Sequence, residues 1–259
     1  MHNPALILSE LAIGYTDGKC KHQVVDTINA SLFDGELVSL IGSNGAGKST
    51  LLRTVSAFQR PLSGEILYRN LNEKIDAAAQ LSRHIAIVLT GREPIYNLTV
   101  REVIAMGRTP YTGFFGKSTA RDREIIEESM ATLGITHLSE RPIEAISDGE
   151  RQKTMIAKAL AQQTPIILLD EPTAFLDFIS RVHLMQTLRR LAHESRKAIL
   201  LSTHDLELAL QLSDRLWLID KGQLHSGSVE ELSANGTLPS FIDSEGIRYD
   251  RKEKKIIIT

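Results

Sequence analysis

The chain has 259 residues and a formal net charge of −2, and 42% of its residues are hydrophobic. A chain of this length makes one large domain or two modest ones, and its nearly balanced charge argues against a nucleic-acid-binding surface. The single cysteine, Cys20, excludes an internal disulfide and fits a reducing compartment. The N-terminal residues predict no signal peptide, and no apolar run approaches the roughly 20 residues of a membrane-spanning helix. Any role at a membrane would therefore require another chain to cross it.

The first part of the chain is predicted to be rich in β-structure. Residues 5–33 alternate between apolar and polar side chains, which indicates antiparallel strands joined by a turn at residues 16–19. The apolar run at residues 37–41 predicts a buried strand. Further along, residues 61–67 are expected to form a turn that leads into a strand, and residues 85–89 another buried strand.

Residues 42–50 read Gly-Ser-Asn-Gly-Ala-Gly-Lys-Ser-Thr and fit the G-x-x-x-x-G-K-[ST] pattern of a phosphate-binding loop. The pattern lies between a predicted strand and a helix expected from Ser49, a context that favours a phosphate site over a glycine-rich turn without a ligand. Glycines let the backbone wrap closely around a phosphate, and the N–H groups of the loop and of the helix N-terminus attract an anion. We expect Lys48 to reach the β- and γ-phosphates and the Ser49 hydroxyl to hold Mg²⁺. The expected nucleotide-binding residues of the loop are Gly42, Ser43, Asn44, Gly45, Ala46, Gly47, Lys48, Ser49 and Thr50.

The spacing of apolar residues becomes helical between residues 91 and 162, which predicts a helical insertion into an α/β core. Helices are expected at residues 100–106, 120–133 and 149–161, with a connector at residues 107–118. The alternation of strands and helices that follows indicates a parallel sheet. These elements are strands at residues 166–169, 198–202 and 215–219 and helices at residues 178–195 and 205–212. Two short β-like runs at residues 246–259 are compatible with a hairpin.

The strand expected at residues 166–169 ends in two acids, Asp170 and Glu171. Phosphate-loop enzymes place an acid near their metal in this way, so Asp170 is predicted to hold Mg²⁺, through water. Glu171 lies at the mouth of the strand, where it is suited to orient and deprotonate an attacking water. Strand ends often carry acids, so the two acids indicate a nucleotide site only in combination with the phosphate loop.

A third motif, Ile-Ser-Asp-Gly-Glu at residues 146–150, opens a predicted helix. With the phosphate loop and the acidic strand, in this order along nearly the whole chain, it resembles the ATP-binding subunits of ABC transporters, whose signature reads Leu-Ser-Gly-Gly-Gln. The resemblance implies ATP hydrolysis with ATP and Mg²⁺ as cofactors. It also implies an α/β fold: a phosphate-loop NTPase core of mixed sheet, with an N-terminal antiparallel β-subdomain and an inserted helical subdomain.

The resemblance implies a single ABC ATPase domain over residues 1–259. Its nucleotide-binding core is expected at residues 1–90 and 163–221, its helical subdomain at residues 91–162, and a C-terminal tail at residues 222–259.

The resemblance also assigns roles to individual residues. Tyr15 stands where the family has an aromatic residue that stacks on adenine, residues 174–177 resemble the D-loop, and His204 stands at the place of the switch histidine. The implied site comprises Glu171, His204 and Lys48 for catalysis, Ser147, Gly149 and Glu150 as further nucleotide contacts, and Ser49, Asp170 and Thr90 at the metal.

Each of these residues also has an ordinary structural explanation. Ser147 and Glu150 fit a capping box, which needs no ligand, although one hydroxyl can both accept from its helix and donate to a phosphate. Tyr15 fits an ordinary strand tyrosine, and His204 a capping or core histidine. These alternatives remain open at the level of sequence.

Two positions depart from the family pattern. Thr90 replaces a glutamine that touches Mg²⁺ and senses the transmembrane partner in the family, so a metal contact at Thr90 is expected to pass through water, or Arg92 or Glu93 to substitute. Asp148 replaces the first signature glycine. A carboxylate is repelled by a γ-phosphate more strongly than the about 0.3–1 kcal/mol by which a helix N-terminus favours it. We therefore predict that the Asp148 side chain points away from the nucleotide.

The resemblance implies a two-fold dimer, in which ATP lies between the phosphate loop of one copy and the signature segment of the other. The implied partners are transmembrane permease subunits, a second copy of the chain and, indirectly, a substrate-binding protein, but no nucleic acid. This places the chain peripherally on the cytoplasmic face of the cell membrane. Within the family, residues 98–111 and 161–163 look like the importers of iron-siderophores, haem and vitamin B12. Residues 109–116 are candidates for permease contact, unless Phe114 and Phe115 pack on their own helical block.

Two other functions compete with an importer motor. A soluble ABC-type ATPase of DNA repair or translation would usually carry coiled coils, two cassettes or basic tracts, and the sequence has none. A regulatory nucleotide-binding cassette with little turnover is opposed by Lys48, Asp170, Glu171 and His204, but favoured by Thr90 and Asp148.

Overall fold

The computed structural model describes residues 4–17, 20–69, 81–91, 94–112, 118–243, 246–253 and 255–258. Four positions discussed above, Arg92, Glu93, Phe114 and Phe115, lie outside these residues, as does half of the turn expected at residues 16–19. Within the described ranges, none of the helices combines the length and the hydropathy that a membrane span requires.

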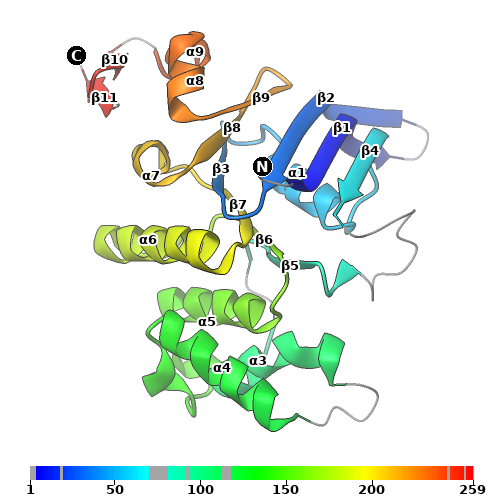
Figure 1. Cartoon of the computed structure of the whole chain (residues 1–259), viewed down its shortest axis with the longest axis vertical. Coiled ribbons are helices and arrows are strands. Elements are labelled where there is room, and N and C mark those ends of the chain that lie inside the picture. The colour runs from blue at the N-terminus through cyan, green and yellow to red at the C-terminus, as the bar shows by residue number, and fades with distance from the viewer. Residues whose placement is uncertain are drawn as a thin grey trace.

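A six-stranded sheet forms the centre of the molecule (Figure 1). Its strands follow the order β5-β6-β7-β3-β8-β9, of which the first five are parallel and β9 is antiparallel. The strands are β3 (Leu37–Gly42), β5 (Ile85–Val88), β6 (Ile166–Leu169), β7 (Ala198–Ser202), β8 (Arg215–Asp220) and β9 (Gln223–Gly227). All residues of β3, β6 and β7 are buried, as expected of parallel strands covered on both faces.

A second, three-stranded antiparallel sheet lies beside the central one, in the order β2-β1-β4. It consists of β1 (Pro4–Asp17), β2 (Cys20–Phe33) and β4 (Ser63–Tyr68), which confirms the antiparallel β-structure predicted for this part of the chain. Helix α1 (Lys48–Val55) packs between the two sheets: its Leu51, Leu52 and Val55 share one hydrophobic cluster with residues of β1, β2, β3, β6 and β7.

The opposite face of the central sheet carries the helical block. Its elements are α3 (Val100–Ala105), the 3₁₀ helices η1 (Met106–Tyr111), η2 (Thr136–Leu138) and η3 (Ile143–Ala145), α4 (Ala120–Thr132) and α5 (Asp148–Ala161). Successive residues of a strand point to opposite faces, so Ile167 and Leu169 of β6 contact this block, whereas Ile166 and Leu168 contact the α1 side. Helix α6 (Phe178–Ser195) joins the same cluster. Thus α1 and α5 cover opposite faces of one sheet.

The C-terminal part contains structure beyond the sequence-based prediction. Helix α7 (Leu206–Leu212) and strand β8 were expected, but β9, α8 (Val229–Ala234) and α9 (Thr237–Ile242) extend the core past residue 221. The hairpin compatible with the last residues is present as β10 (Ile247–Asp250) and β11 (Lys255–Ile258). Tyr249 of β10 is buried in a cluster with residues of α7, α8 and α9, so the hairpin docks on this layer.

Candidate active site

The phosphate-binding loop connects β3 to α1 and depends on its glycines. Gly47 has φ +105°, and a Cβ there would lie 2.6 Å from Cγ1 of Val24. A Cβ on Gly42 would lie 2.9 Å from the carbonyl oxygen of Ile219 in the neighbouring strand. Any larger residue at these positions would therefore force the loop away from the sheet.

Lys48 is the first residue of α1 and is buried, with a relative exposure of 6%. Its Nζ donates to the carbonyl oxygens of Gly42, at 2.8 Å, and Ser43, at 3.1 Å. Burial lowers the pKa of the Lys48 ammonium, while the carboxylates of Glu171 and Asp170 act in the opposite direction. The ammonium thus lies within the loop and near both acids.

Asp170 follows β6 and its carboxylate gathers two hydroxyls from different segments. Its Oδ1 accepts from Ser49 Oγ at 3.1 Å and from Ser202 Oγ at 2.7 Å. The residue is 2% exposed. The fold thereby joins the phosphate loop, the end of β6 and the end of β7 at one carboxylate.

Sequence reasoning gave Ser202 no role, although the structure puts it at the centre of this cluster. Its hydroxyl donates to Asp170 and accepts from the backbone N–H of Glu171 at 2.9 Å. The available signal was its position as the last residue of an apolar strand, two residues before His204.

Glu171 and His204 meet across the ends of β6 and β7. His204 Nε2 lies 2.6 Å from Glu171 Oε1, and both side chains are partly exposed. Glu171 has a left-handed backbone with φ +49°, which turns the chain sharply where the strand ends. The pair opens on a cavity of about 500 Å³ that is also lined by Asp205, Glu207 and Ile256, among others.

Thr90 lies beside this cluster. Its Oγ1 donates to the backbone carbonyl of Asp170 at 3.0 Å, and the Asp170 N–H donates to Val88 at 2.8 Å. The hydroxyl proton of Thr90 is thus engaged within the chain, while its oxygen lone pairs are available to a water or a metal-bound water.

Tyr15 lies near the end of β1 and is about half exposed. Its hydroxyl shares a hydrogen bond with the Thr50 hydroxyl on α1. The tyrosine ring is therefore fixed beside the helix that follows the phosphate loop, and part of the ring remains accessible.

Ser147 caps helix α5 through a complete capping box with Glu150. The Ser147 hydroxyl accepts from the Glu150 N–H at 3.3 Å and donates to Glu150 Oε2 at 2.8 Å. The Ser147 N–H also donates to the Glu150 carboxylate at 2.8 Å, and these bonds lower the pKa of that carboxyl. To donate to a phosphate, the Ser147 hydroxyl has to rotate away from Glu150.

The two signature positions next to Ser147 face different surroundings. A Cβ on Gly149 would lie 3.0 Å from Leu176 Cδ2, so this glycine lets α5 approach the segment that resembles the D-loop. Asp148 lines a cavity of about 260 Å³ together with Tyr96, Ile146 and Arg151, among others. The orientation of Asp148 relative to a nucleotide stays a prediction.

Known proteins are similar to this chain over most of its length. The family described as ABC transporter matches residues 25–174. An uncharacterised ABC transporter ATP-binding protein of Methanocaldococcus jannaschii is 43% identical over 210 residues, which are 81% of this chain and 71% of that protein. The iron(3+)-hydroxamate import ATP-binding protein of Bacillus subtilis is 34% identical over 258 residues, 98% of this chain and 94% of that protein. The cobalamin import ATP-binding protein of Halobacterium salinarum is 36% identical over 223 residues, 86% of this chain but only 56% of that longer protein.

Solved structures agree with these relatives. A chain of a candidate metal-chelate type ABC transporter in an inward-facing conformation has a TM-score of 0.79 at 24% identity, covering 99% of this chain and 97% of its own length, and shows the fold. A bacterial ABC transporter cassette solved as a dimer has a TM-score of 0.76 at 26% identity, covering 86% of this chain and 98% of its own length. The chain therefore belongs to the ATP-binding subunits of ABC transporters, and it is an ATPase.

Proposed function

We propose that this chain is the ATP-hydrolysing motor of an ABC importer, which closes as a two-fold dimer on two ATP molecules and drives a separate transmembrane permease. The observation that carries the proposal is the convergence of Lys48, Asp170, Glu171 and His204, which come from the ends of three adjacent strands. Ligand sites of open α/β sheets lie at such carboxyl ends.

The residues suit distinct roles in phosphoryl transfer to water. Lys48 neutralises charge on the β- and γ-phosphates, which lowers the energy of the transition state. Glu171 accepts the proton of the attacking water. His204, whose Nε2 lies 2.6 Å from the Glu171 carboxylate, holds that water and the γ-phosphate in line. Tyr15 presents its ring to the adenine.

The oxygen atoms around Asp170 suit Mg²⁺, which prefers carboxylate, hydroxyl and water ligands. Ser49 and Asp170 would hold it, with Thr90 acting through water. When bound, Mg²⁺ supplies positive charge to the phosphate oxygens.

The second copy completes the site in this proposal. The phosphate loop belongs to the α1 side of the sheet, whereas the signature segment 147–150 begins the helix that covers the other face. A two-fold axis brings these two surfaces together twice, so both sites form at once. ATP binding then closes the dimer, and hydrolysis reopens it.

The names of the relatives support a proposal for the cargo and the membrane partner. Relatives at 34% and 36% identity import iron(3+)-hydroxamate and cobalamin. We infer a cargo of the iron-siderophore, haem or cobalamin class, delivered by a substrate-binding protein to the permease. The chain would act at the cytoplasmic face of the membrane, with residues 1–90 and 163–221 as the nucleotide-binding core and residues 91–162 facing the permease.

Substitution of the proposed base tests this mechanism. Glu171→Gln should bind ATP as tightly as the parent chain, because Lys48 and the loop are unchanged, but its hydrolysis rate should fall about 100-fold or more. Glu207→Gln is the matched control, because Glu207 lines the same cavity whereas the carboxylate that pairs with His204 is that of Glu171, and it should hydrolyse ATP normally. Normal phosphate release by Glu171→Gln would refute the assignment. A parent chain that binds ATP but never hydrolyses it, with or without a co-expressed permease, would favour the regulatory cassette.

A further inference from the structure

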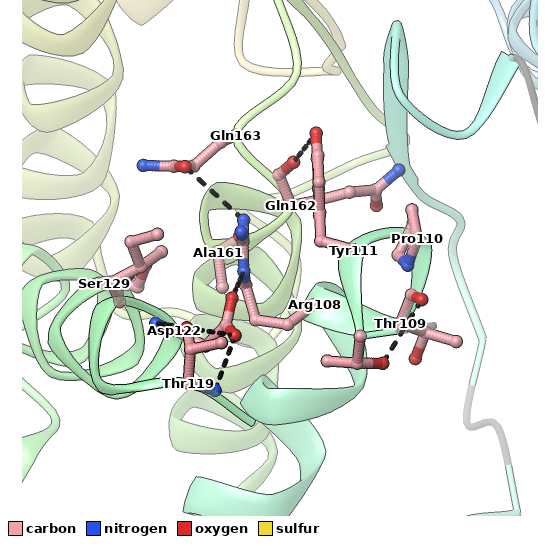
Figure 2. A network of polar contacts seen from close by, with 12 residues as sticks. Arg108, Thr109, Pro110, Tyr111, Thr119, Asp122, Ser129, Ala161, Gln162 and Gln163 are labelled. Atoms are coloured by element: carbon pink, nitrogen blue, oxygen red, sulfur yellow. Dashed lines mark hydrogen bonds and ion pairs between the residues drawn. The ribbon is translucent and has the colours of Figure 1, made fainter. Parts of the chain in front are cut away.

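The segment Gly107–Tyr111, at the end of α3, lies directly against the C-terminal end of α5 (Figure 2). A Cβ on Gly107 would lie only 2.2 Å from the carbonyl oxygen of Lys158, so no larger residue permits this contact. None of the proposed catalytic steps uses this segment.

Arg108 is the buried centre of the contact, with a relative exposure of 6%. Its Nε donates to Asp122 Oδ1 at 2.8 Å, and its Nη1 donates to the carbonyl oxygen of Ala161 at 2.8 Å. A longer bond of 3.4 Å reaches Gln163 Oε1. One guanidinium thus ties η1 to the start of α4 and to the last turn of α5 (Figure 2).

Asp122 is held from its own helix as well. Its carboxylate accepts from the Thr119 N–H at 2.9 Å and from the Thr119 hydroxyl at 2.7 Å, which completes the capping box of α4. These bonds, followed by the bond from Arg108, lower the pKa of the Asp122 carboxyl to about 2. The pair with Arg108 therefore remains charged at neutral pH.

Tyr111 connects the same contact to the central sheet. Its ring lies 4.1 Å below the Arg108 guanidinium, and its hydroxyl donates to the carbonyl oxygen of Gln162 at 3.0 Å. The Gln162 side chain in turn donates to the carbonyl oxygen of Ile85, the first residue of β5, at 2.9 Å. Arg83, just before β5, donates to the carbonyl oxygen of Pro110 at 2.9 Å.

We propose that Arg108, Tyr111, Asp122 and Gln162 form a joint that sets the angle of α5 against the central sheet. Ser147 caps the opposite end of that helix, 14 residues and about 20 Å away. With this lever, a tilt of about 10° at the joint moves Ser147 by about 3.5 Å, enough to break a hydrogen bond. Arg108 and Tyr111 are thus positioning residues for the signature segment and touch no nucleotide themselves. The functional role of this helix angle rests on the proposed function, in which Ser147 contacts the ATP bound to a second copy of the chain.

The angle can be measured in the isolated chain by pulsed electron spin resonance. In a chain with Cys20→Ser, one spin label is attached at Ala145→Cys, two residues before Ser147, and the other at Glu194→Cys on α6. Both positions are exposed. The parent should give one narrow distance distribution. Arg108→Met and the milder Tyr111→Phe should broaden it or shift it by a few ångströms, as the lever predicts. Arg121→Met is the control, since Arg121 forms an exposed ion pair with Glu124 on α4.

Association of the chain provides the second readout, in the Glu171→Gln background. The joint variants should bind ATP as the parent does, because the phosphate loop lies on the other face of the sheet. Their ATP-driven dimerisation should weaken about tenfold or more, since each site loses a charge-assisted hydrogen bond from Ser147.

The two measurements separate the two proposals. Unchanged distance distributions in a folded Tyr111→Phe or Arg108→Met chain would overturn the joint. If Arg108→Met fails to fold, Tyr111→Phe decides, because it removes a single hydroxyl. Altered distances with no ATP-driven association even in the parent would support the joint and overturn the proposed dimer instead.

Discussion

At the scale of single residues, the site is organised by hydroxyl groups that hold the acids in place. Ser49 and Ser202 both donate to Asp170, and Ser202 also accepts from the Glu171 backbone. Buried polar groups without partners are costly, so these hydrogen bonds stabilise the buried Asp170 carboxyl group in its place near Lys48. Two uncharged serines therefore hold the Asp170 carboxylate, and one of them also holds the backbone of Glu171.

Ser202→Ala should lower the rate of ATP hydrolysis by about tenfold, because it leaves Asp170 Oδ1 and the Glu171 N–H with one partner fewer and loosens the proposed base. Its control is Ser39→Ala. Ser39 is equally buried in the adjacent strand β3, and its hydroxyl shares a hydrogen bond of 2.6 Å with the Ser213 hydroxyl, away from the two acids. Both variants should lose about 1–3 kcal/mol of unfolding free energy, but only Ser202→Ala should lose activity. Equal activities in a phosphate-release assay would contradict this.

Asp122 gives a pH dependence with a defined sign. Its pKa is about 2 in the folded chain, below the ordinary value of 3.8. The stability that it contributes is therefore fully present above about pH 4 and is lost as the pH falls through 2. Asp122→Asn keeps a side-chain oxygen that accepts from the Thr119 N–H, but its amide does not titrate, so the variant lacks this pH dependence of stability. The difference in unfolding free energy between parent and variant, measured by urea denaturation, should be constant from pH 7 to 5 and shrink at pH 3. A difference that grows on acidification would exclude this origin.

At the scale of elements, the N-terminus of α5 serves both as a helix cap and as a proposed ligand contact. Its N-terminus is a complete capping box, so Ser147 is explained without any nucleotide. Its C-terminus is fixed by Arg108 and Tyr111. The cap completes the hydrogen bonds of the first turn, and the bonds from Arg108 and Tyr111 anchor the last turn, so the helix can act as a rigid lever from its anchored C-terminal end.

A substitution that keeps the cap separates the two roles of Ser147. Aspartate accepts from the Glu150 N–H as serine does, but it cannot donate to the Glu150 carboxylate and is repelled by it, so Ser147→Asp should lose about 1 kcal/mol of unfolding free energy. In the Glu171→Gln background it should fail to dimerise with ATP, because its carboxylate would face the γ-phosphate. Ser228→Asp, in the matching capping box of α8, should dimerise normally. Undiminished dimerisation of Ser147→Asp in sedimentation experiments would remove Ser147 from the proposed site.

At the scale of the whole molecule, the central sheet separates the two halves of the proposed site. Helix α1 covers one face and α5 the other, and each belongs to its own hydrophobic cluster. Because closely packed clusters resist deformation, one chain cannot easily bring its own Ser147 to its own phosphate loop. A second copy related by a two-fold axis avoids this deformation.

The Glu171→Gln chain should therefore be monomeric with ADP and dimeric with ATP, with an association that depends on protein concentration. Sedimentation velocity with each nucleotide measures this directly. High salt should weaken the dimer, because the nucleotide charges that hold it are screened. An ATP-saturated chain that remains monomeric at all concentrations would exclude the two-fold arrangement.

The structure of a segment was predicted correctly where it depends on a local pattern of residue types. The phosphate loop, its flanking strand and helix, and the alternation after residue 166 are all local patterns of glycine and apolar spacing. Prediction from the sequence was incomplete at β9, α8 and α9, where short, half-buried elements give weak periodicity. The capping box at Ser228 and Glu231 was a usable signal for α8 that the prediction overlooked.

The sequence by itself determined the family, the order of the motifs and the residue types that the proposed chemistry requires, because these depend on neighbours along the chain. Only the tertiary structure decided which of them meet. Ser202 reaches Asp170 because β6 and β7 are adjacent parallel strands, and Arg108 reaches Asp122 and Ala161 because three helical segments converge there. Such contacts join residues far apart in sequence, and packing rather than local propensity selects them.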